Sequence, residues 1–221
     1  MSAAATRRCP PPGRPAPPRP AAAGGASDRS GRTDRPDRAA LEAARGGTVR
    51  DLVAPGLRVL LCGVNPSLWS AWAGLHFARP SNRLWAALAG SGLVPRRLHP
   101  AETGALLEAG VGVTNLVARA TARADELDDD ELREGLEGVR GLAERWRPGC
   151  VAVLGLTAYR VASGDRRAGV GARPERLGPS RVWLLPNPSG LNAAYQQPAL
   201  DAAYADLRRA LDGEVVPDAW R

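Results

Sequence analysis

The sequence predicts an α/β protein in which helices cover both faces of a largely parallel central sheet, a three-layer α/β/α sandwich. Four short runs of Val, Leu and other apolar residues recur along the chain; three of them end at a turn that contains Gly or Pro, and the one at 110–117 ends in a polar loop. Segments with the apolar spacing of helices separate these runs. Continuous apolar runs are typical of strands that are buried on both faces, and strands that alternate with helices form parallel sheets.

The N-terminal segment differs in composition from the rest of the 221-residue chain. Residues 1–36 hold eight of the twenty prolines and almost no apolar residue larger than Ala, so they cannot form a core. We therefore expect residues 1–45 to be a disordered basic tail that passes into a short helix near 38–44. Residues 46–221 are expected to form one globular domain.

The positive charge of the chain is concentrated in this tail. The formal net charge is +7, and residues 1–45 contribute +5 because nine Arg face four acidic residues there. A cationic arm adds salt-sensitive attraction to polyanions, including the DNA backbone. The alternative is compositional: the chain contains no Lys, so an Arg-rich bias could place arginines in any tail.

The cysteines are odd in number and scattered, at Cys9, Cys62 and Cys150. This pattern predicts a reducing compartment without disulfides, and it argues against a zinc or iron–sulfur site, which generally needs four ligands. No apolar stretch approaches the ~20 residues of a membrane helix, and the start lacks the apolar region of a signal peptide. We expect a soluble, cytoplasmic protein without metal, cofactor or membrane contact.

The elements expected in the first half of the domain follow from periodicity and turn residues. They are a strand in 57–67 that ends at an Asn-Pro turn, a long loop at 66–81, a helix at 82–90 with Ser81 as N-cap, a short helix at 100–109, and a strand at 110–117. The long loop shows neither the apolar period of a helix nor that of a strand, and loops of this length inside compact domains are usually functional.

The second half follows the same alternation. The expected elements are a polar loop at 118–125, a helix at 129–146 capped by Asp128, a strand at 150–155, a helix near 157–162, an irregular Gly- and Arg-rich segment at 164–179, a strand at 181–186 and a final helix near 199–211. We expect the chain to fray around Pro217.

Two strand-end loops share an Asn-Pro-Ser signature, at Asn65-Pro66-Ser67 and at Asn187-Pro188-Ser189. Proline restricts the preceding residue to extended conformations, so each Asn taken alone is typical of a turn. Ligands of open α/β sheets bind outside the carboxyl ends of the strands, however, and both loops are expected at that edge. The pair therefore indicates a site, with Asn65 as its main candidate.

Residues for several other chemistries are missing. The two histidines, His76 and His99, fall in no nucleophile elbow, metal-ligand pair or phosphate loop. The Gly-x-Gly patterns at 110–112 and 169–171 lack the strand–turn–helix context of a dinucleotide site. Amides, backbone N–H groups, one Phe and arginines remain. Such groups suit a reaction in which a positioned water and electrostatic stabilisation suffice, and cleavage of a nucleobase from its sugar fits.

Four segments carry a resemblance to a known family. They are Leu-Leu-Cys-Gly-Val-Asn-Pro-Ser (60–67), Phe-Ala-Arg-Pro-Ser-Asn-Arg-Leu-Trp (77–85), Gly-Val-Thr-Asn-Leu-Val-Ala-Arg (112–119) and Leu-Pro-Asn-Pro-Ser-Gly-Leu (185–191). In this order and spacing they resemble the mismatch-specific uracil/thymine DNA glycosylases, over residues 49–211 or so. The resemblance implies a uracil-DNA glycosylase-like fold.

The resemblance also implies roles for the matched residues. Asn65 corresponds to the catalytic amide that orients the water attacking C1′. Val64 and Phe77 correspond to positions whose backbone groups bind the flipped pyrimidine, with the Phe77 ring stacked on the base. Ser70 corresponds to a serine beside the base pocket, and Asn187 is expected to contribute to the same pocket from the second loop.

The resemblance further implies an intercalation loop formed by Pro188, Ser189, Gly190 and Leu191. Leu191 would fill the gap that the extruded nucleotide leaves, which compensates lost stacking. Family members can carry an Arg directly after this Leu, whereas Asn192 follows here, which leaves recognition of the opposite base open.

Large and basic side chains surround the expected pocket. Trp69 and Trp72 could narrow it against the C5 methyl group of thymine, or simply cover the fold. Phosphate contacts that position duplex DNA without reading its sequence are expected from arginines on loops and helix starts, namely Arg79, Arg83, Arg119 and Arg123.

The leading expectation is a monomeric, monofunctional DNA glycosylase that excises uracil, and related damaged pyrimidines, from mismatched double-stranded DNA. Its product is an abasic site for base excision repair. Two alternatives stay open: a uracil-glycosylase relative that acts on single-stranded uracil or deaminated purines, and a non-catalytic module that binds damaged DNA.

Overall fold

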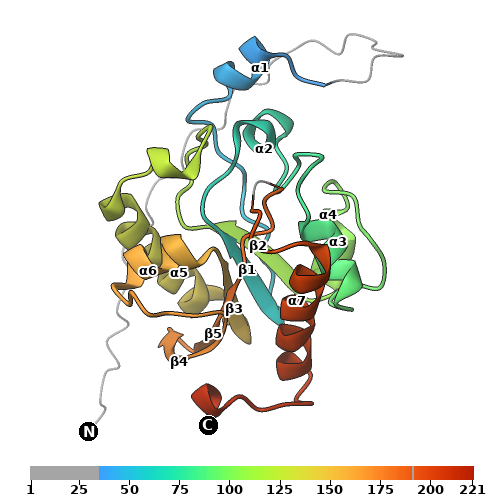
Figure 1. Cartoon of the computed structure of the whole chain (residues 1–221), viewed down its shortest axis with the longest axis vertical. Helices are drawn as coiled ribbons and strands as arrows, with labels where there is room; N and C mark the ends of the chain where they lie inside the picture. Colours follow the sequence, from blue (N-terminus) through green and yellow to red (C-terminus); the bar gives the residue numbers. More distant parts are fainter. Residues whose placement is uncertain (1–34, 191) are drawn as a thin grey trace, which may run out of the picture. The chain divides into compact units, whose positions relative to one another are not determined.

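A five-stranded sheet in the order β2-β1-β3-β5-β4 forms the centre of the computed structural model, which describes residues 35–190 and 192–221. Four strands are parallel, and β4 pairs antiparallel with β5 at one edge. The strands span Val59–Gly63 (β1), Val111–Asn115 (β2), Cys150–Leu154 (β3), Gly171–Leu177 (β4) and Ser180–Leu185 (β5). The predicted α/β fold with a largely parallel sheet is confirmed (Figure 1).

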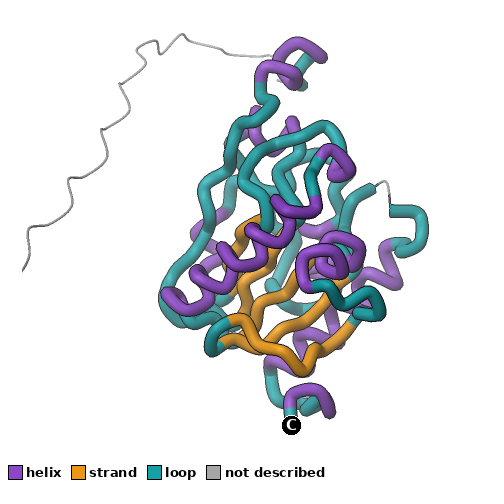
Figure 2. Tube along the Cα trace, turned by 90° about the vertical axis from the view of Figure 1, so that its left-hand side faces the viewer, coloured by secondary structure: helices purple, strands orange, loops and turns teal. Residues whose placement is uncertain are grey.

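Helices cover both faces of the sheet, which makes the three layers (Figure 2). One apolar cluster joins the sheet to α3 (Leu84–Gly90), α4 (Thr103–Glu108) and α7 (Gln197–Leu211), and the other joins it to α5 (Asp129–Trp146) and α6 (Leu156–Ser163). Within β1, Val59 and Leu61 belong to the first cluster and Cys62 to the second, as expected for a strand that is buried on both faces.

The expected loop at 66–81 contains a short helix, α2 (Leu68–Ala73), so the expectation of an irregular segment was wrong there. The Ser67 hydroxyl accepts a hydrogen bond from the backbone N–H of Ser70, and Gly74 ends the helix at φ 66°. Six residues are too few to display a 3.6-residue period, but the capping residues at both ends were visible in the sequence.

The start of α3 also differs from the prediction. Ser81 is not its N-cap; the helix begins at Leu84, and Asn82 Oδ1 accepts from the Leu84 N–H at 2.9 Å. A turn closed by Asn82 N–H and the Arg79 carbonyl, 2.8 Å apart, leads the chain into this position. The N-cap position therefore falls on Arg83, which has no side-chain cap, and Asn82 satisfies the first N–H of the helix.

Two further expectations need correction near the C-terminal end. The segment 164–179 contains β4, whose exposed, charged face and bulge between Arg173 and Arg176 hide it from a search for apolar runs. The chain beyond Pro217 does not fray: Asp218–Trp220 form a 3-10 turn (η2). The indole of Trp220 is buried and donates to the Val182 carbonyl at 3.2 Å.

The longest helix, α5, matches its predicted bounds, and Glu131 accepts from the backbone N–H of Asp128 at 2.9 Å. The acidic first turn of this helix complements the positive end of the helix dipole. None of the helices in the described part of the chain is long and apolar enough to cross a membrane.

A short helix, α1 (Arg38–Ala43), is present where one was expected, but it belongs to the compact unit Pro36–Arg221. The unit therefore begins before the expected boundary at residue 46. The chain that follows α1 is hydrogen-bonded to the rest of the domain, since the Gly46 N–H donates to the Ala120 carbonyl at 2.9 Å. The expected disorder of residues 1–34, together with Cys9, lies outside the described residues.

Candidate active site

A cavity of about 430 Å³ opens at the carboxyl ends of the parallel strands. β1 ends there at Gly63, followed by Val64 and Asn65, while β2 ends at Asn115 and the loop after β5 contributes Asn187. The end of β3 and the segments around α2 and the 119–125 loop complete the wall. This is the edge at which open α/β sheets bind ligands.

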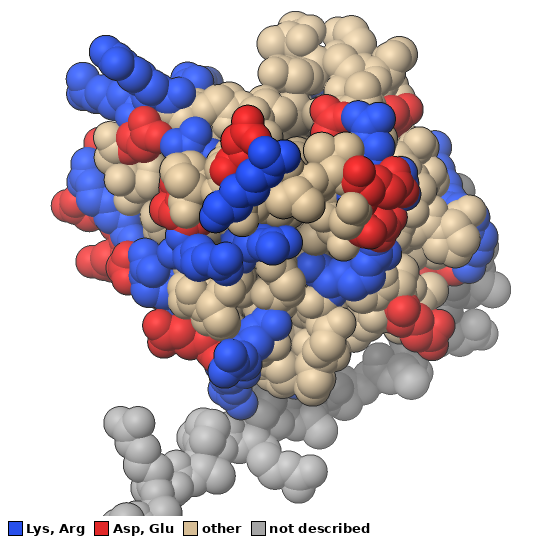
Figure 3. All heavy atoms as spheres, turned by 90° about the horizontal axis from the view of Figure 1, so that it is seen from below, with Lys and Arg blue, Asp and Glu red and all other residues tan. Residues whose placement is uncertain are grey.

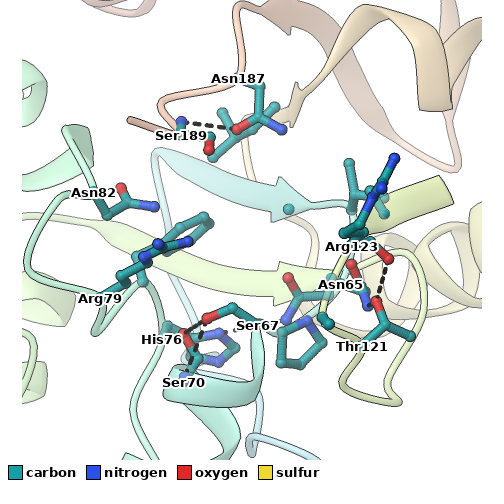
Figure 4. A pocket seen from close by; sticks show the side chains of 18 of the residues that line it. Asn65, Ser67, Ser70, His76, Arg79, Asn82, Thr121, Arg123, Asn187 and Ser189 are labelled. Carbon is teal, nitrogen blue, oxygen red and sulfur yellow. Dashed lines mark hydrogen bonds between the residues drawn. The ribbon is translucent and has the colours of Figure 1, made fainter. Parts of the chain in front are cut away.

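The cavity brings together most of the residues predicted for the site. Those that line it are Val64, Asn65, Ser70, Phe77, Arg79, Arg123, Asn187 and Ser189. Asn65 and Thr121 lie together on one side, and Asn187 and Ser189 lie across the hollow from Ser70 and His76 (Figure 4). Pro188, Gly190, Arg83 and Arg119 are not among the lining residues. Leu191 is outside the described residues.

The amide of Asn65 is held in one orientation. Its Nδ2 donates to the Arg119 carbonyl at 3.0 Å and to Thr121 Oγ1 at 2.7 Å. A carbonyl can only accept, and the buried Thr121 hydroxyl gives its own proton to the Arg123 carbonyl at 2.7 Å, so both groups require the NH₂ side of Asn65. Asn65 Oδ1 has no partner in the described part of the chain and can accept from a water in the cavity.

A second asparagine, Asn115, is oriented by the buried His76. Nε2 of His76 lies 3.0 Å from the Arg50 carbonyl, which requires the ring proton on Nε2. Nδ1 is then an acceptor, and Asn115 Nδ2 lies 3.4 Å from it. Burial lowers the pKa of His76, although the Arg50 hydrogen bond and the charge of Asp51 oppose the shift, so the ring is neutral at pH 7. The Nδ2 group of Asn115 is therefore used by His76, and its Oδ1 is left to accept a hydrogen bond from a ligand in the cavity.

Gly63 makes room for this oxygen at the end of β1. A Cβ atom at residue 63 would lie 2.4 Å from Asn115 Oδ1 and 3.1 Å from Cζ of Phe77. The floor of the cavity thus consists of strand backbone, an amide oxygen and the edge of an aromatic ring. Sequence reasoning assigned no role to Asn115, although it follows an apolar strand in the same way as Asn65; the roles of His76 and Thr121 were also missed.

The Phe77 segment is fixed from both sides. The Phe77 carbonyl accepts from the Trp85 indole at 3.2 Å, and the next N–H, of Ala78, donates to the buried Ser70 hydroxyl at 3.3 Å. Phe77 itself has φ 50°, an uncommon conformation for a bulky residue. Its own N–H has no acceptor in the described ranges and is available to a ligand.

Two of the four arginines expected to contact phosphate have internal partners in the structure. Arg119 pairs with Glu131 through Nε at 2.6 Å and Nη2 at 2.7 Å, and this pairing holds the pKa of Glu131 at about 2. Arg83 is bound to backbone carbonyls of the 189–195 segment. Backbone carbonyls occupy both terminal nitrogens of Arg83, whereas the Arg119 side chain is still 40% exposed beside Glu131.

Arg79 and Arg123 remain candidates for phosphate contacts. Both are exposed and line the cavity, and the Arg123 side chain is 74% exposed with Asp125 as its ion-pair partner. At the end of the molecule away from α2, by contrast, basic and acidic side chains are intermixed (Figure 3). That mixed face offers no broad field of one sign for a polyanion.

Trp69 and Trp72 do not line the cavity, so they do not narrow it. Their rings pack edge to face with centroids 6.1 Å apart on α2, and Trp72 is 39% exposed. The structure favours the second expectation for these residues, that they cover the fold.

The cavity combines two oriented amide oxygens, a flat aromatic ring and a free backbone N–H. Its one imidazole is neutral, and the nearest thiol, Cys62, is buried, which raises its pKa and keeps it protonated. Such a site can bind a small planar heterocycle with donor and acceptor groups at its edge, and it can orient a water without taking its proton.

Comparison with known proteins is consistent with this chemistry. Residues 50–208 match the model of the uracil DNA glycosylase superfamily. The backbone is similar to a solution structure from Methanosarcina acetivorans, described as a "putative Uracil DNA glycosylase". The TM-score is 0.54 at 16% sequence identity, over 76% of this chain and 98% of that chain. At this level of identity the likeness shows the shared fold.

Proposed function

The chain belongs to the uracil DNA glycosylase superfamily, and from this premise we propose that it is a monofunctional, mismatch-specific uracil-DNA glycosylase. It acts as a monomer on double-stranded DNA, extrudes the uracil of a mismatched pair and hydrolyses its glycosidic bond, which leaves an abasic site. The observation that carries the proposal is the locked amide of Asn65, which lines the cavity and whose Oδ1 has no partner among the described residues.

Hydrolysis requires a water at C1′ of the extruded nucleotide. Asn65 Oδ1 accepts a hydrogen bond from this water. The hydrogen bond orients the water so that a lone pair of the water oxygen points at C1′. The C1′–N1 bond breaks with its electron pair on the base, the water oxygen bonds to C1′, and the water proton passes to solvent or to the departing base. An amide cannot take that proton, so the contribution of Asn65 is orientation.

The base is recognised by groups whose hydrogen-bonding sense is fixed. Uracil presents an N3–H donor between two carbonyl acceptors. Asn115 Oδ1 accepts from N3–H, the free N–H of Phe77 donates to a carbonyl, and the Phe77 ring stacks on the base. Cytosine has an acceptor at N3, which would face the lone pairs of Asn115 Oδ1. This arrangement favours uracil over cytosine.

Preference for mismatches follows from the cost of extrusion. Removing a base from the stack costs a few kcal/mol and least for a mismatched pair, so an enzyme with modest base affinity acts first where pairing is weakest. The loop after β5, with Leu191 as the wedge, would fill the space that the extruded nucleotide leaves in the duplex.

Thr121 should matter for catalysis because its hydroxyl helps to fix the orientation of Asn65. Thr121→Val removes one of the two acceptors that lock Asn65, and we expect the single-turnover excision rate to fall by roughly 3- to 10-fold, the effect of one hydrogen bond. Thr157→Val, at an exposed position of α6, is the matched control and should leave the rate unchanged. An unaltered rate in Thr121→Val would show that Asn65 does not depend on this contact.

The pH profile should report the state of His76. Its pKa lies below the ordinary value of 6.5, so the ring stays neutral from pH 8 to 7 and protonates only at lower pH. Protonated Nδ1 would donate to Asn115 and turn the NH₂ group toward the base. We expect the excision rate, measured from pH 8 to pH 5, to fall only below about pH 6.5, together with the stability of the fold. A rate that rises as the pH falls would contradict this role.

A panel of substrates tests the proposed function. Single-turnover rates would be measured on oligonucleotides with uracil in a G·U pair, an A·U pair and a single strand, and with hypoxanthine. We expect the G·U substrate to be processed fastest. Fastest excision from a single strand or of hypoxanthine would favour the alternative specificities, and binding of the G·U duplex without any product would favour a damage-binding module.

A further inference from the structure

Arg83 makes an unusual set of contacts to the loop that follows β5. Its Nη1 donates to the Tyr195 carbonyl at 2.7 Å, and its Nη2 donates to the carbonyls of Ser189 at 2.7 Å and Asn192 at 2.8 Å. Its backbone N–H donates to the Pro188 carbonyl at 2.9 Å. One residue thus binds four carbonyls across a segment whose described residues form no helix or strand.

The same loop is pressed against the turn that precedes Arg83. A Cβ atom on Gly190 would lie 2.6 Å from the Ser81 carbonyl, so only glycine allows this approach. Two other residues of the turn, Arg79 and Asn82, line the cavity. The turn at 79–83 therefore joins the wall of the base pocket to the loop that carries Leu191.

The chemistry of the contact requires an arginine. Three carbonyls that point at one centre from different positions match the planar fork of a guanidinium, whereas an ammonium group is a compact point donor on a flexible stem. Arg83 Nε is buried and has no partner in the described part of the chain, which is a cost of placing the group there. The side chain is half-buried and its terminal nitrogens are occupied, so it is not a phosphate ligand.

We infer that Arg83 is a positioning residue for base extrusion. It anchors the backbone on both sides of position 191, at residues 188–189 and 192–195, to the pocket wall. In the proposed complex this anchoring lets Leu191 enter the duplex while the extruded base enters the cavity. This inference rests on the proposed function. If the loop were not held, part of the free energy gained on inserting the wedge would be spent on ordering the loop. Base extrusion would then be slower, although the pocket and Asn65 would be unchanged.

A double-mutant cycle with the wedge tests the inference. Single-turnover excision from a G·U duplex would be measured for the wild type, Arg83→Met, Leu191→Ala and the double variant. We expect Arg83→Met to lower the rate by roughly 10- to 100-fold in the wild-type background, and by less than about threefold in the Leu191→Ala background, because the wedge through which it acts is gone. Arg97→Met, which removes an exposed charge, is the control and should stay within about twofold of the wild type.

Equal losses in both backgrounds would overturn the inference, since a general defect of the fold lowers the rate irrespective of the wedge. A wild-type rate in Arg83→Met would overturn it as well. Arg83→Lys keeps the charge but cannot reach three carbonyls, and it replaces Arg83→Met in the cycle if thermal unfolding shows that variant to be unfolded. Absence of uracil release by the wild type would instead refute the proposed function, which separates the two failures.

Discussion

Asn65→Ala is expected to lower uracil excision from a G·U duplex by roughly 10²- to 10⁴-fold, the usual contribution of a group that activates or orients a reacting water. The variant removes the Oδ1 acceptor together with the Nδ2 donor to Arg119 and Thr121, and it leaves the other lining residues in place. Binding of the duplex, measured by gel shift, should change little, because the phosphate contacts and the wedge loop are untouched. Single-turnover kinetics with alkaline cleavage of the abasic product measure the rate.

Asn65→Asp is the informative companion variant. Asp retains acceptor oxygens but, when ionised, cannot donate to the Arg119 carbonyl or to Thr121, and it places negative charge beside that carbonyl. We expect it to lose most of the activity as well, although it could act as a base. Activity of Asn65→Ala within about threefold of the wild type would show that water is positioned by another group, whereas an active Asn65→Asp would show that a carboxylate can take over this role.

Gly63→Ala is expected to cause the second largest loss, about 100-fold or more in excision rate. The added methyl group would collide with Asn115 Oδ1, 2.4 Å away, and press on the Phe77 ring. Asn115 is a short side chain held by His76, so it can move only by breaking that hydrogen bond and entering the space of the base. The readout is excision together with thermal unfolding, since the defect should lie mainly in the pocket.

Gly138→Ala is the matched control. Gly138 lies on the exposed side of α5, and no atom is within 4 Å of an added Cβ. Alanine in a helix interior should raise the free energy of unfolding by up to about 1 kcal/mol and leave excision unchanged. A Gly63→Ala variant that retains wild-type excision would show that the floor of the cavity does not receive the base.

The sequence was most informative where one residue type dominates a segment. The four parallel strands are nearly continuous apolar runs because both of their faces are covered, and α5 displays its apolar stripe over five turns with an acidic start. β4 lies at the edge with charged residues on its open face, so its pattern resembles that of a loop. The six-residue α2 is too short for its period to be recognised.

The candidate site was predictable to the extent that its residues lie at strand ends. Asn65 and Asn187 were located by the turn signals that follow them, and both line the cavity. Asn115 carries no such signal. The partners of Arg83 and Arg119 are distant in sequence, and a one-dimensional pattern cannot distinguish an arginine that binds loop carbonyls from one that faces DNA. The internal partners of these two arginines are therefore visible only in the tertiary structure.

The most direct test of the central claim is release of uracil from a duplex with one G·U pair, followed by mass spectrometry of base and strand, for the wild type and Asn65→Ala. The account predicts free uracil and an abasic strand that breaks only in hot alkali, with release nearly abolished in the variant. Equal release by both proteins, or none by a wild type that binds the duplex, would contradict it.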